Sequence, residues 1–424
     1  MRWPAPVATG PVDADVRVPG SKSMTNRALV LSALADGDSF VHNPLRSRDT
    51  ELMAAALGAL GAEVHVGQRE WTITGRPFAA PDEVIDVGNA GTVARFVLAI
   101  ATLARGPVRL DGDAQIRSRP LGPLVTALRD LGVRVDAAAT GGLPATVHGT
   151  GAVRGGAVTI DASSSSQFLS ALLLAAPRYD EGLSLTHEGG PVPSGPHLDM
   201  TVAMLREAGV TVDTPSGTSW VVAPGDVRPR QWTIEPDLSS AAPFLAAAVA
   251  TTGQVRLADW PATTTQPGGR LPELLRAFGA STSVEGNTLV VTGPDDIAGI
   301  DADLQDCGEL TPVIAALAAF ATTPSHLSGI GHLRGHETDR LAALATQLNA
   351  LGSDVAETED GLVIKPRPMH GGVFATYDDH RMAMAGAVIG LVVPGVVLDD
   401  VQTTRKTLPG FATMWADLLG AEHS

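Results

Sequence analysis

The sequence predicts an α/β fold made of six repeated units, and two recurring patterns support this prediction. The first is a short apolar strand, followed by small or polar residues and then by a helix rich in alanine and leucine. The second is an amphipathic helix that ends in a glycine. Each pattern occurs six times at a spacing of roughly 70 residues, and the two alternate in phase. Six unrelated strand–helix pairs would not be expected to repeat in this way.

The first pattern begins at Val18 with "VPGSKSMTNRALVLSAL", in which a strand leads into a helix with little polar surface. A helix that is apolar on all sides is expected to be buried. Equivalent stretches are "VIDVGNAGTVARFVLAIATLA", "VTIDASSSSQFLSALLLAA", "WTIEPDLSSAAPFLAAAVA", "DADLQDCGELTPVIAALAAFA" and "FATYDDHRMAMAGAVIGLVV", which begin at Val84, Val158, Trp232, Asp301 and Phe374.

The second pattern ends each amphipathic helix with a glycine that follows an apolar residue. Glycine stops helices because it adopts the left-handed backbone conformation at little cost. Each unit is therefore expected to run strand, buried helix, strand, amphipathic helix, strand, strand. The six glycines are Gly61, Gly132, Gly209, Gly279, Gly352 and Gly420.

Most of the amphipathic helices carry a cation or a serine at or just before the first turn. Examples are "RSRDTELM", "RSRPLGPL", "RGHETDRLAAL" and "TRKTLPGF". The positive end of a helix dipole favours anions, so cations there are unfavourable unless an anion compensates. Their repetition suggests an anionic ligand, although surface arginines without a ligand are the alternative.

Composition restricts the class of protein. The chain has 424 residues, too many for one ordinary core, so at least two domains are expected. Its net charge of −16 argues against a general affinity for nucleic acid or anionic membranes. The apolar run from Met382 contains Pro394 and is shorter than a membrane span, so a buried helix followed by a strand is expected.

The sequence predicts neither a metal site nor a cofactor. No Cys/His set has zinc spacing, there is no Walker-type phosphate loop, and "GNAGT" lacks the third glycine of a dinucleotide-binding motif. The single Cys307 fits a reducing compartment, and the first ten residues lack the apolar segment of a signal peptide. We therefore expect a cytoplasmic protein, and nothing in the composition opposes a monomer.

Lysine is rare in this chain, which makes its placement informative. Only Lys22, Lys365 and Lys406 occur, although lysine and arginine together number 30. Lys22 stands at the start of the first buried helix, where a chemical role is the simplest explanation.

The sequence resembles the 5-enolpyruvylshikimate-3-phosphate (EPSP) synthase family of enolpyruvyl transferases from end to end. The most specific motifs are "PGSKSMTNRAL", "GNAGT", "RSRPLGPL", "SSQFLSALL", "HETDRLAAL", "DDHRMAMA" and "RKTLPGF". The resemblance implies two similar α/β domains, each of three βαβαββ repeats around buried parallel helices, an arrangement called an inside-out barrel. It suggests domains at 18–231 and at 1–17 plus 232–424.

The resemblance also implies a reaction without metal or organic cofactor. Members of the family transfer the enolpyruvyl group of phosphoenolpyruvate to the 5-hydroxyl of shikimate 3-phosphate and release phosphate, a step of aromatic amino-acid biosynthesis. Glyphosate competes with phosphoenolpyruvate in this family. Two phosphates and two carboxylates must then be neutralised by protein groups. Lys22 would lie between the two substrates, where a slender point charge can touch both.

The resemblance assigns site residues position by position. The residues matching shikimate 3-phosphate ligands are Lys22, Ser23, Arg27, Ser165, Ser166, Gln167, Ser194, Glu309 and His336. Those matching phosphoenolpyruvate ligands are Lys22, Gly91, Arg119, Gln167, Arg340, Arg381 and Lys406. The expected catalytic residues are Glu309, Glu337 and Lys22. Glu309 is the expected base at the 5-hydroxyl, and Glu337 is the expected proton donor to C3 of phosphoenolpyruvate.

Four positions depart from the pattern and two alternatives stay open. Family members often carry Asp, Tyr, Lys and Asn where this chain has Glu309, His197, His336 and His332. These differences affect the expected acceptor contacts and pH optimum. The first alternative is transfer to a UDP-amino sugar, but the sister enzymes that do this typically carry a cysteine in the stretch that reads "DGDAQIRSRP" here. The second is a catalytically silent homologue, which would be expected to lose Lys22, Glu309 or Glu337.

Overall fold

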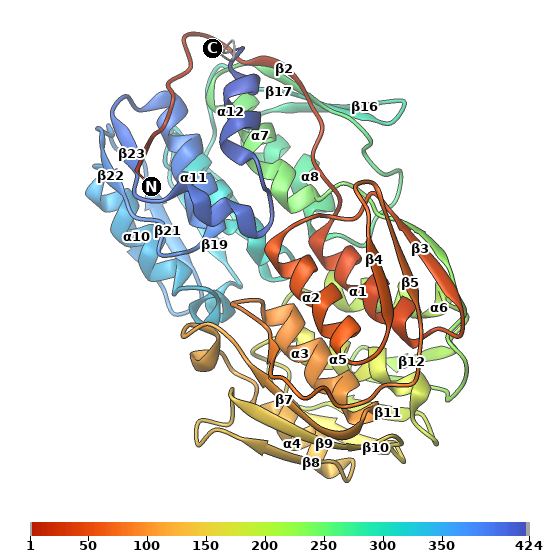
Figure 1. Cartoon of the computed structure of the whole chain (residues 1–424). Coiled ribbons are helices and arrows are strands. Elements are labelled where there is room, and N and C mark those ends of the chain that lie inside the picture. The colour runs from red at the N-terminus through yellow and green to blue at the C-terminus, as the bar shows by residue number, and fades with distance from the viewer. Residues whose placement is uncertain (1, 421–424) are drawn as a thin grey trace. The chain divides into compact units, whose positions relative to one another are not determined.

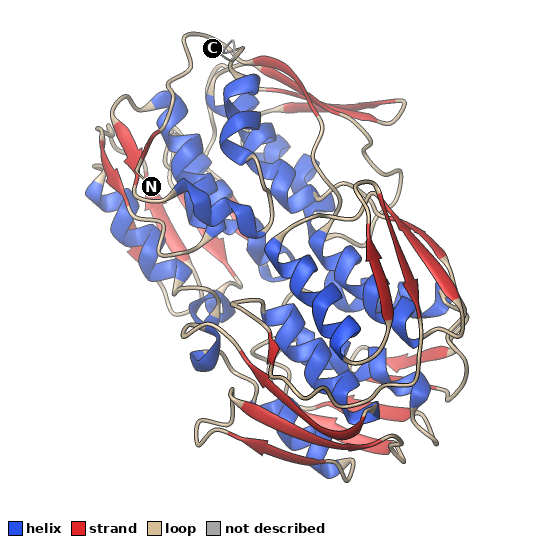
Figure 2. Cartoon of the chain, viewed as in Figure 1, coloured by secondary structure: helices blue, strands red, loops and turns tan. Residues whose placement is uncertain are grey.

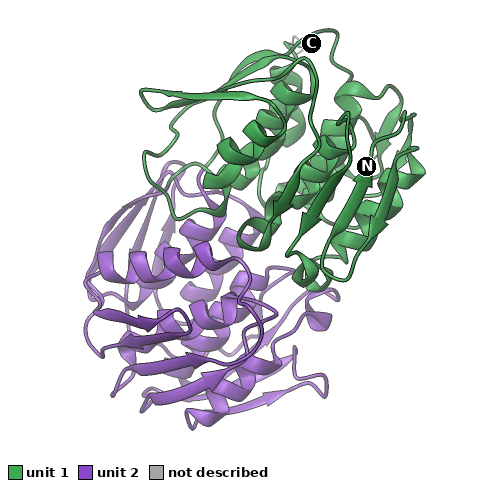
Figure 3. Cartoon of the chain, turned by 180° about the vertical axis from the view of Figure 1, so that it is seen from behind, with its two compact units in different colours: residues 1–19, 235–424 green, residues 20–234 purple. Residues whose placement is uncertain are grey.

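The structure is a computed structural model that describes residues 2–420. The chain divides into two compact units (Figure 3): unit 1 comprises residues 1–19 and 235–424, and unit 2 comprises residues 20–234. Each unit has its own apolar core. The chain crosses between the units twice, near Gly20 and near Glu235.

Unit 2 contains three successive repeats (Figure 1). The first consists of α1 (Lys22–Leu34), β3 (Asp38–His42), α2 (Arg48–Ala59), β4 (Glu63–Val66) and β5 (Glu70–Thr74). The second consists of β6 (Ile85–Asp86), α3 (Gly91–Ile100), η1 (Ala101–Leu103), β7 (Arg105–Asp111), η2 (Ile116–Ser118), α4 (Gly122–Asp130), β8 (Arg134–Ala137) and β9 (Ala145–Thr150). The third consists of β10 (Gly156–Ile160), α5 (Gln167–Ala175), η3 (Ala176–Arg178), β11 (Leu183–His187), α6 (Gly195–Glu207), β12 (Val212–Ser216) and β13 (Ser219–Val222), after which comes β14 (Gln231–Thr233).

Unit 1 also contains three repeats, together with the N-terminal strands β1 (Trp3–Pro4) and β2 (Asp13–Val16). The fourth repeat of the chain consists of α7 (Leu238–Ala250), β15 (Gln254–Leu257), η4 (Pro267–Arg270), α8 (Leu271–Ala277), β16 (Ser281–Glu285) and β17 (Thr288–Thr292). The fifth consists of β18 (Asp301–Asp303), η5 (Gln305–Leu310), α9 (Thr311–Ala318), β19 (Ser325–Ser328), η6 (Gly331–Gly335), α10 (Arg340–Ala350), β20 (Asp354–Glu357) and β21 (Leu362–Lys365). The sixth consists of β22 (Gly372–Phe374), α11 (His380–Val392), β23 (Val396–Leu398), η7 (Val401–Lys406) and α12 (Phe411–Leu418).

Each complete repeat forms a four-stranded sheet of one design. The second repeat has the order β6-β7-β9-β8, in which β6 and β7 are parallel and the other pairs are antiparallel. The sheets β10-β11-β13-β12 and β18-β19-β21-β20 follow the same pattern. A parallel pair needs a crossover, and the buried helix of each repeat supplies it. The six repeats and the α/β fold class predicted from the sequence are therefore confirmed.

Two leading strands are exchanged between the repeats. The family resemblance had placed residues 1–17, and with them β2, in the second domain, but the repeat pattern alone did not reveal the exchange. β14 was expected to open the fourth repeat, but it pairs with β3 of the first repeat, with Trp232 opposite Val41. The fourth repeat is completed instead by β2, whose Val16 lies opposite Leu257 of β15. As a result, the chain leaves unit 2 only after Ile234, three residues later than the expected boundary.

The sixth repeat has no hairpin of its own to complete its sheet within the described residues. β22 and β23 are parallel, and β1 pairs with β23 in the antiparallel sense. The N-terminal strand thus takes the position that β21 occupies in the fifth repeat.

The first helix of each repeat is buried, as its apolar composition predicts. Helices α3 and α9 are buried at every residue. Helix α7 is buried over its first twelve residues, and α11 is buried up to Leu391. Figure 2 shows these helices together with the strands that surround them in each unit. A helix with apolar residues on all faces is stable only when neighbours cover all of it.

Two local predictions are also confirmed. The six helix-ending glycines all have positive φ, from 66° at Gly420 to 114° at Gly61. The apolar run from Met382 forms most of α11 and then β23. Within residues 2–420, no helix is both long and apolar enough to cross a bilayer.

Candidate active site

Three predicted ligand residues stand at equivalent places in unit 2. Lys22, Gly91 and Gln167 are the first residues of the buried helices α1, α3 and α5. The backbone N–H groups of a first helical turn have no partner within the helix, and the dipole makes this end positive. The sequence therefore places three anion-favouring helix ends in one unit.

Lys22 is held by a carboxylate that the sequence analysis did not identify. Its Nζ lies 3.2 Å from Oδ2 of Asp49, which belongs to the first turn of α2. The Lys22 side chain is 17% exposed and that of Asp49 only 4%. The buried carboxylate fixes the direction of the lysine side chain.

Arg27 is a buried residue of α1 whose guanidinium donates hydrogen bonds to four neighbouring residues. Its Nε donates to Oγ1 of Thr201 (2.8 Å), and its two Nη atoms donate to the carbonyls of Ser23 (3.1 Å) and His197 (2.9 Å) and to Oγ of Ser170 (3.2 Å). Burial lowers its pKa to about 9. Arg27 thus positions Ser23, whose Oγ lies 3.4 Å from Nε2 of His197.

Gly91 lies directly against two arginines. A Cβ built on Gly91 would fall 2.8 Å from Nη2 of Arg119 and 2.6 Å from Nη1 of Arg95. Arg95 was not predicted, yet it is buried and its Nη1 donates to Oε1 of Gln167 (2.9 Å). The structure therefore brings Gly91, Arg119 and Gln167 together through Arg95.

The serines predicted for the acceptor substrate occupy two loops of the third repeat. Ser165 Oγ accepts from the backbone N–H of Gln167 (3.3 Å), and Ser166 is buried at the start of α5. Ser194 precedes α6 and has a left-handed backbone, with φ of 54°. A serine in this conformation is uncommon, and such positions often occur at binding sites.

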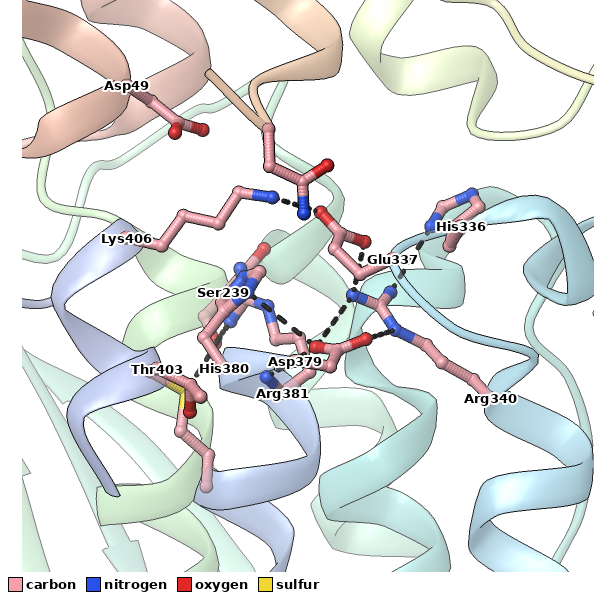
Figure 4. A network of polar contacts seen from close by, with 12 residues as sticks. Asp49, Ser239, His336, Glu337, Arg340, Asp379, His380, Arg381, Thr403 and Lys406 are labelled. Carbon is pink, nitrogen blue, oxygen red and sulfur yellow. Dashed lines mark hydrogen bonds and ion pairs between the residues drawn. The ribbon is translucent and has the colours of Figure 1, made fainter. Parts of the chain in front are cut away.

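A chain of alternating charges forms the predicted site in unit 1 (Figure 4). Glu337 lies between two cations: its Oε1 is 2.6 Å from Nζ of Lys406, and its Oε2 is 3.0 Å from Nη2 of Arg340. Arg340 is also paired with Asp379, at 2.7 Å from Nε to Oδ2 and 3.2 Å from Nη2 to Oδ1. The side chains of Arg340 and Asp379 are 3% and 0% exposed.

Asp379 links this ion pair to the start of α11. As the N-cap residue, it accepts a hydrogen bond at Oδ1 from the backbone N–H of Arg381 (2.8 Å). The guanidinium of Arg381 donates from Nη1 to the carbonyl of Ser239 (2.6 Å). One buried carboxylate therefore fixes the guanidinium of Arg340 and the first turn that carries Arg381.

The two arginines of this network differ in their electrostatics. Burial alone would lower the pKa of Arg340, but the carboxylates of Asp379, Glu337 and Glu309 outweigh it and raise the pKa. Burial lowers the pKa of Arg381, and the carboxylates of Asp237 and Glu309 oppose that effect only in part. The predicted base Glu309 is thus close enough to act on both arginines.

Two histidines stand at the positions where family members often have Asn and Lys. The rings of His332 and His336 meet edge to face, with centroids 5.7 Å apart. Burial lowers the pKa of His332, with Glu309 opposing the shift. Arg340 can only donate, so its contact of 3.3 Å from Nη1 makes Nδ1 of His336 an acceptor.

Three of the cations that precede the second helices have carboxylate partners within the protein. Arg46 pairs with Glu51 at 3.0 Å, Arg48 with Asp113 at 2.7 Å, and Arg117 with Asp111 at 2.6 Å. All three arginine side chains are at least half exposed. For these three arginines, nearby carboxylates supply a compensating charge without a ligand.

Among the described residues, no group of three or more His, Cys, Asp or Glu side chains is arranged to hold a metal ion. Cys307 is buried, and burial raises its pKa to about 12, so its thiol is protonated at neutral pH.

Comparison with known proteins identifies the family. Residues 7–415 match the family model described as EPSP synthase (3-phosphoshikimate 1-carboxyvinyltransferase). A 3-phosphoshikimate 1-carboxyvinyltransferase of Kocuria rhizophila is 54% identical over 431 residues, covering 99% of this chain and 97% of the relative.

Solved structures share the fold. An EPSP synthase from Acinetobacter baumannii superposes with a TM-score of 0.83 at 25% sequence identity. The superposition covers 98% of this chain and 97% of the Acinetobacter chain. The enolpyruvyl transferase NikO from Streptomyces tendae superposes with a TM-score of 0.76 at 18% sequence identity, and the superposition covers 98% of this chain and 97% of the NikO chain. The inside-out barrel fold expected from the sequence is confirmed, and the chain belongs to the EPSP synthase family.

Proposed function

We propose that this protein transfers the enolpyruvyl group of phosphoenolpyruvate to the 5-hydroxyl of shikimate 3-phosphate and releases phosphate. The observation that carries the proposal is the 54% identity to a 3-phosphoshikimate 1-carboxyvinyltransferase over nearly the whole of both chains. The reaction belongs to the shikimate pathway of aromatic amino-acid biosynthesis. The two sets of charged side chains supply the cations that two phosphorylated substrates require.

Addition is the first half of the proposed mechanism. Glu309 removes the proton of the 5-hydroxyl as its oxygen attacks C2 of phosphoenolpyruvate, and a proton from Glu337 is added to C3. The product is a tetrahedral adduct that still carries the phosphate. Lys406 lies 2.6 Å from Glu337 and holds this carboxylate in place.

Elimination is the second half. Glu337 takes back a proton from the methyl group, the C2–O bond to phosphate breaks, Glu309 returns its proton to the departing phosphate, and the enolpyruvyl ether and inorganic phosphate leave. The proposed phosphoenolpyruvate ligands in unit 2 are Lys22, Gly91, Arg119 and Gln167. Those in unit 1 are Arg340, Arg381 and Lys406. The acceptor is bound by Ser23, Arg27, Ser165, Ser166, Gln167 and Ser194, and by Glu309 and His336.

The direct test is phosphate release with each acceptor. Purified protein should release phosphate from phosphoenolpyruvate when shikimate 3-phosphate is present, and neither when the acceptor is omitted nor with a UDP-amino sugar. Activity with the UDP-amino sugar would favour the sister reaction. Absence of turnover with both acceptors would favour a silent homologue. We further propose that the protein acts as a monomer in the cytoplasm.

Turnover is expected to survive exhaustive chelation, because no group of metal-binding side chains occurs among residues 2–420. The measurement is phosphate release before and after dialysis against EDTA. Loss of activity that a divalent ion restores would contradict the cofactor-free mechanism.

Substituting Gly91 by alanine is expected to raise the glyphosate Ki more than the phosphoenolpyruvate KM. The added methyl group would displace the guanidinium ends of Arg119 and Arg95, which lie within 3 Å of it. Glyphosate is longer than phosphoenolpyruvate, so a narrower site should disfavour it more. The measurement is the ratio of the glyphosate Ki to the phosphoenolpyruvate KM in the unmodified protein and in Gly91→Ala. We expect this ratio to be severalfold higher in the variant.

Gly58→Ala is the matched control. Gly58 lies in helix α2, and a Cβ there would meet no other group within 4 Å. This variant should leave the ratio unchanged. An unchanged ratio in Gly91→Ala would mean that Gly91 does not border the inhibitor.

A further inference from the structure

Two loops of the third repeat leave the same edge of one sheet. Strands β10 and β11 are parallel, with Ile160 of one opposite His187 of the other. The loop after β10 contains Ser165 and Ser166 and leads to Gln167, whereas the loop after β11 ends at Ser194. Because parallel strands end on the same side, both predicted acceptor-binding segments start beside His187.

His187 bridges the two loops. Its side chain is almost fully buried, with 6% of the residue exposed. The backbone N–H of Ala162, in the first loop, donates to Nδ1 at 3.1 Å. Nε2 lies 2.8 Å from the carbonyl oxygen of Gly190, in the second loop.

These contacts define the tautomer of the ring. An N–H donor faces Nδ1, so Nδ1 accepts, and the carbonyl of Gly190 accepts, so Nε2 carries the proton. The carbonyl of Ile160 also lies 3.2 Å from Nδ1, but in this tautomer it receives no proton from the ring. The imidazole therefore connects one donor and one acceptor that belong to different loops.

Other contacts hold the loops close at this point. Ser163 Oγ donates to Asp161 Oδ1 at 2.5 Å and lies 3.1 Å from the same carbonyl oxygen of Gly190, and Asp161 Oδ1 also accepts from the backbone N–H of Ser163 at 2.9 Å. Gly189 has φ of 150°, and a Cβ on it would fall 2.5 Å from Asp161 Oδ1. The approach of the two loops thus depends on a glycine with unusual backbone geometry.

We propose that His187 is a positioning residue for the acceptor substrate. By joining Ala162 to Gly190, it sets the separation between the serines before α5 and Ser194 before α6. It contacts no substrate itself. The proposal rests on the proposed function, because it takes these serines to bind shikimate 3-phosphate.

Three substitutions separate the contributions of the two hydrogen bonds that His187 makes with Ala162 and Gly190. His187→Ala removes both, His187→Asn can keep an acceptor near Ala162, and His187→Gln can keep a donor near Gly190. Loss of both hydrogen bonds should raise the KM for shikimate 3-phosphate by about tenfold in the Ala variant, with smaller increases in the other two. The KM for phosphoenolpyruvate should stay within about twofold of that of the unmodified protein, because the loops belong to the acceptor side.

His148→Ala is the matched control. His148 is a partly exposed histidine of β9 in the same unit and lies 2.7 Å from Asp136 through Nε2. It should change neither KM. A purely structural role of His187 predicts a lower Tm and a smaller active fraction with both KM values unchanged, and that result would overturn the proposal.

A second measurement separates this proposal from the proposed function. If the unmodified protein shows no turnover with shikimate 3-phosphate, the function proposed above fails. The link between the loops can still be read from amide hydrogen exchange in the free protein. His187→Ala should accelerate exchange at Ala162 and across 188–194 relative to His148→Ala. Unchanged exchange there would overturn the role of His187 even in an active enzyme.

Discussion

Replacing Glu337 with glutamine is expected to lower kcat by about a thousandfold, because glutamine cannot deliver or accept the proton that C3 of phosphoenolpyruvate exchanges. The side chain keeps its size, so the first turn around Arg340 should keep its shape. Steady-state phosphate release with both substrates saturating is the measurement. Circular dichroism should show an unchanged fold.

Comparing kcat with the KM for phosphoenolpyruvate distinguishes proton transfer by Glu337 from a role in positioning its neighbours. The carboxylate also lies within 3.0 Å of Arg340 and Lys406, so it holds two predicted phosphoenolpyruvate ligands in place. If this were its only role, Glu337→Gln would raise the KM for phosphoenolpyruvate and leave kcat nearly intact. Glu273→Gln, which alters an exposed carboxylate paired with Arg270 in the same unit, is the control and should change neither constant.

The repeats could be predicted from sequence because their signals are local. A helix-ending glycine and an apolar helix are recognised from a few neighbouring residues, and all six glycines have the expected backbone. The exchange of β2 and β14 could not be predicted in this way. Both strands are short, and their partners lie more than 180 residues away in the sequence, with Val16 opposite Leu257 and Trp232 opposite Val41. Nothing near Trp232 distinguishes pairing with β3 from pairing within the next repeat.

The candidate site shows the same limit at the level of side chains. Lys22, Gly91 and Gln167 were assigned by resemblance to the family, and each is the first residue of a buried helix. Their partners Asp49 and Arg95 were not assigned, since only the tertiary structure brings them near. The adjacent aspartates of "DDHR" illustrate the difficulty: Asp378 is exposed, whereas Asp379 is fully buried against Arg340. Two neighbouring residues of one type give no sequence signal for this contrast.

Asp379→Asn is expected to destabilise the protein by about 3–5 kcal/mol, because it leaves a buried guanidinium without its main counterion. Asparagine is also a good N-cap residue, so its side-chain oxygen can still accept from the N–H of Arg381. The substitution therefore removes the charge while keeping the cap. The free energy of unfolding in urea is the measurement. A loss below about 1 kcal/mol would contradict the importance of this pair.

A second substitution separates stability from function at the same pair. In Arg340→Met/Asp379→Asn neither buried charge of the pair remains, so the double variant should be more stable than Asp379→Asn alone. Activity should not return with stability, because Arg340 is also a proposed ligand of phosphoenolpyruvate. In the single variant, loss of the two contacts at 2.7 and 3.2 Å frees the guanidinium to move, and a misplacement of about 1 Å can lower kcat/KM by about a hundredfold. If the double variant recovered both stability and kcat/KM for phosphoenolpyruvate, the ion pair would serve the fold alone. If it recovered stability and stayed inactive, Arg340 would be needed for the reaction and not only for the fold, which is the result we expect.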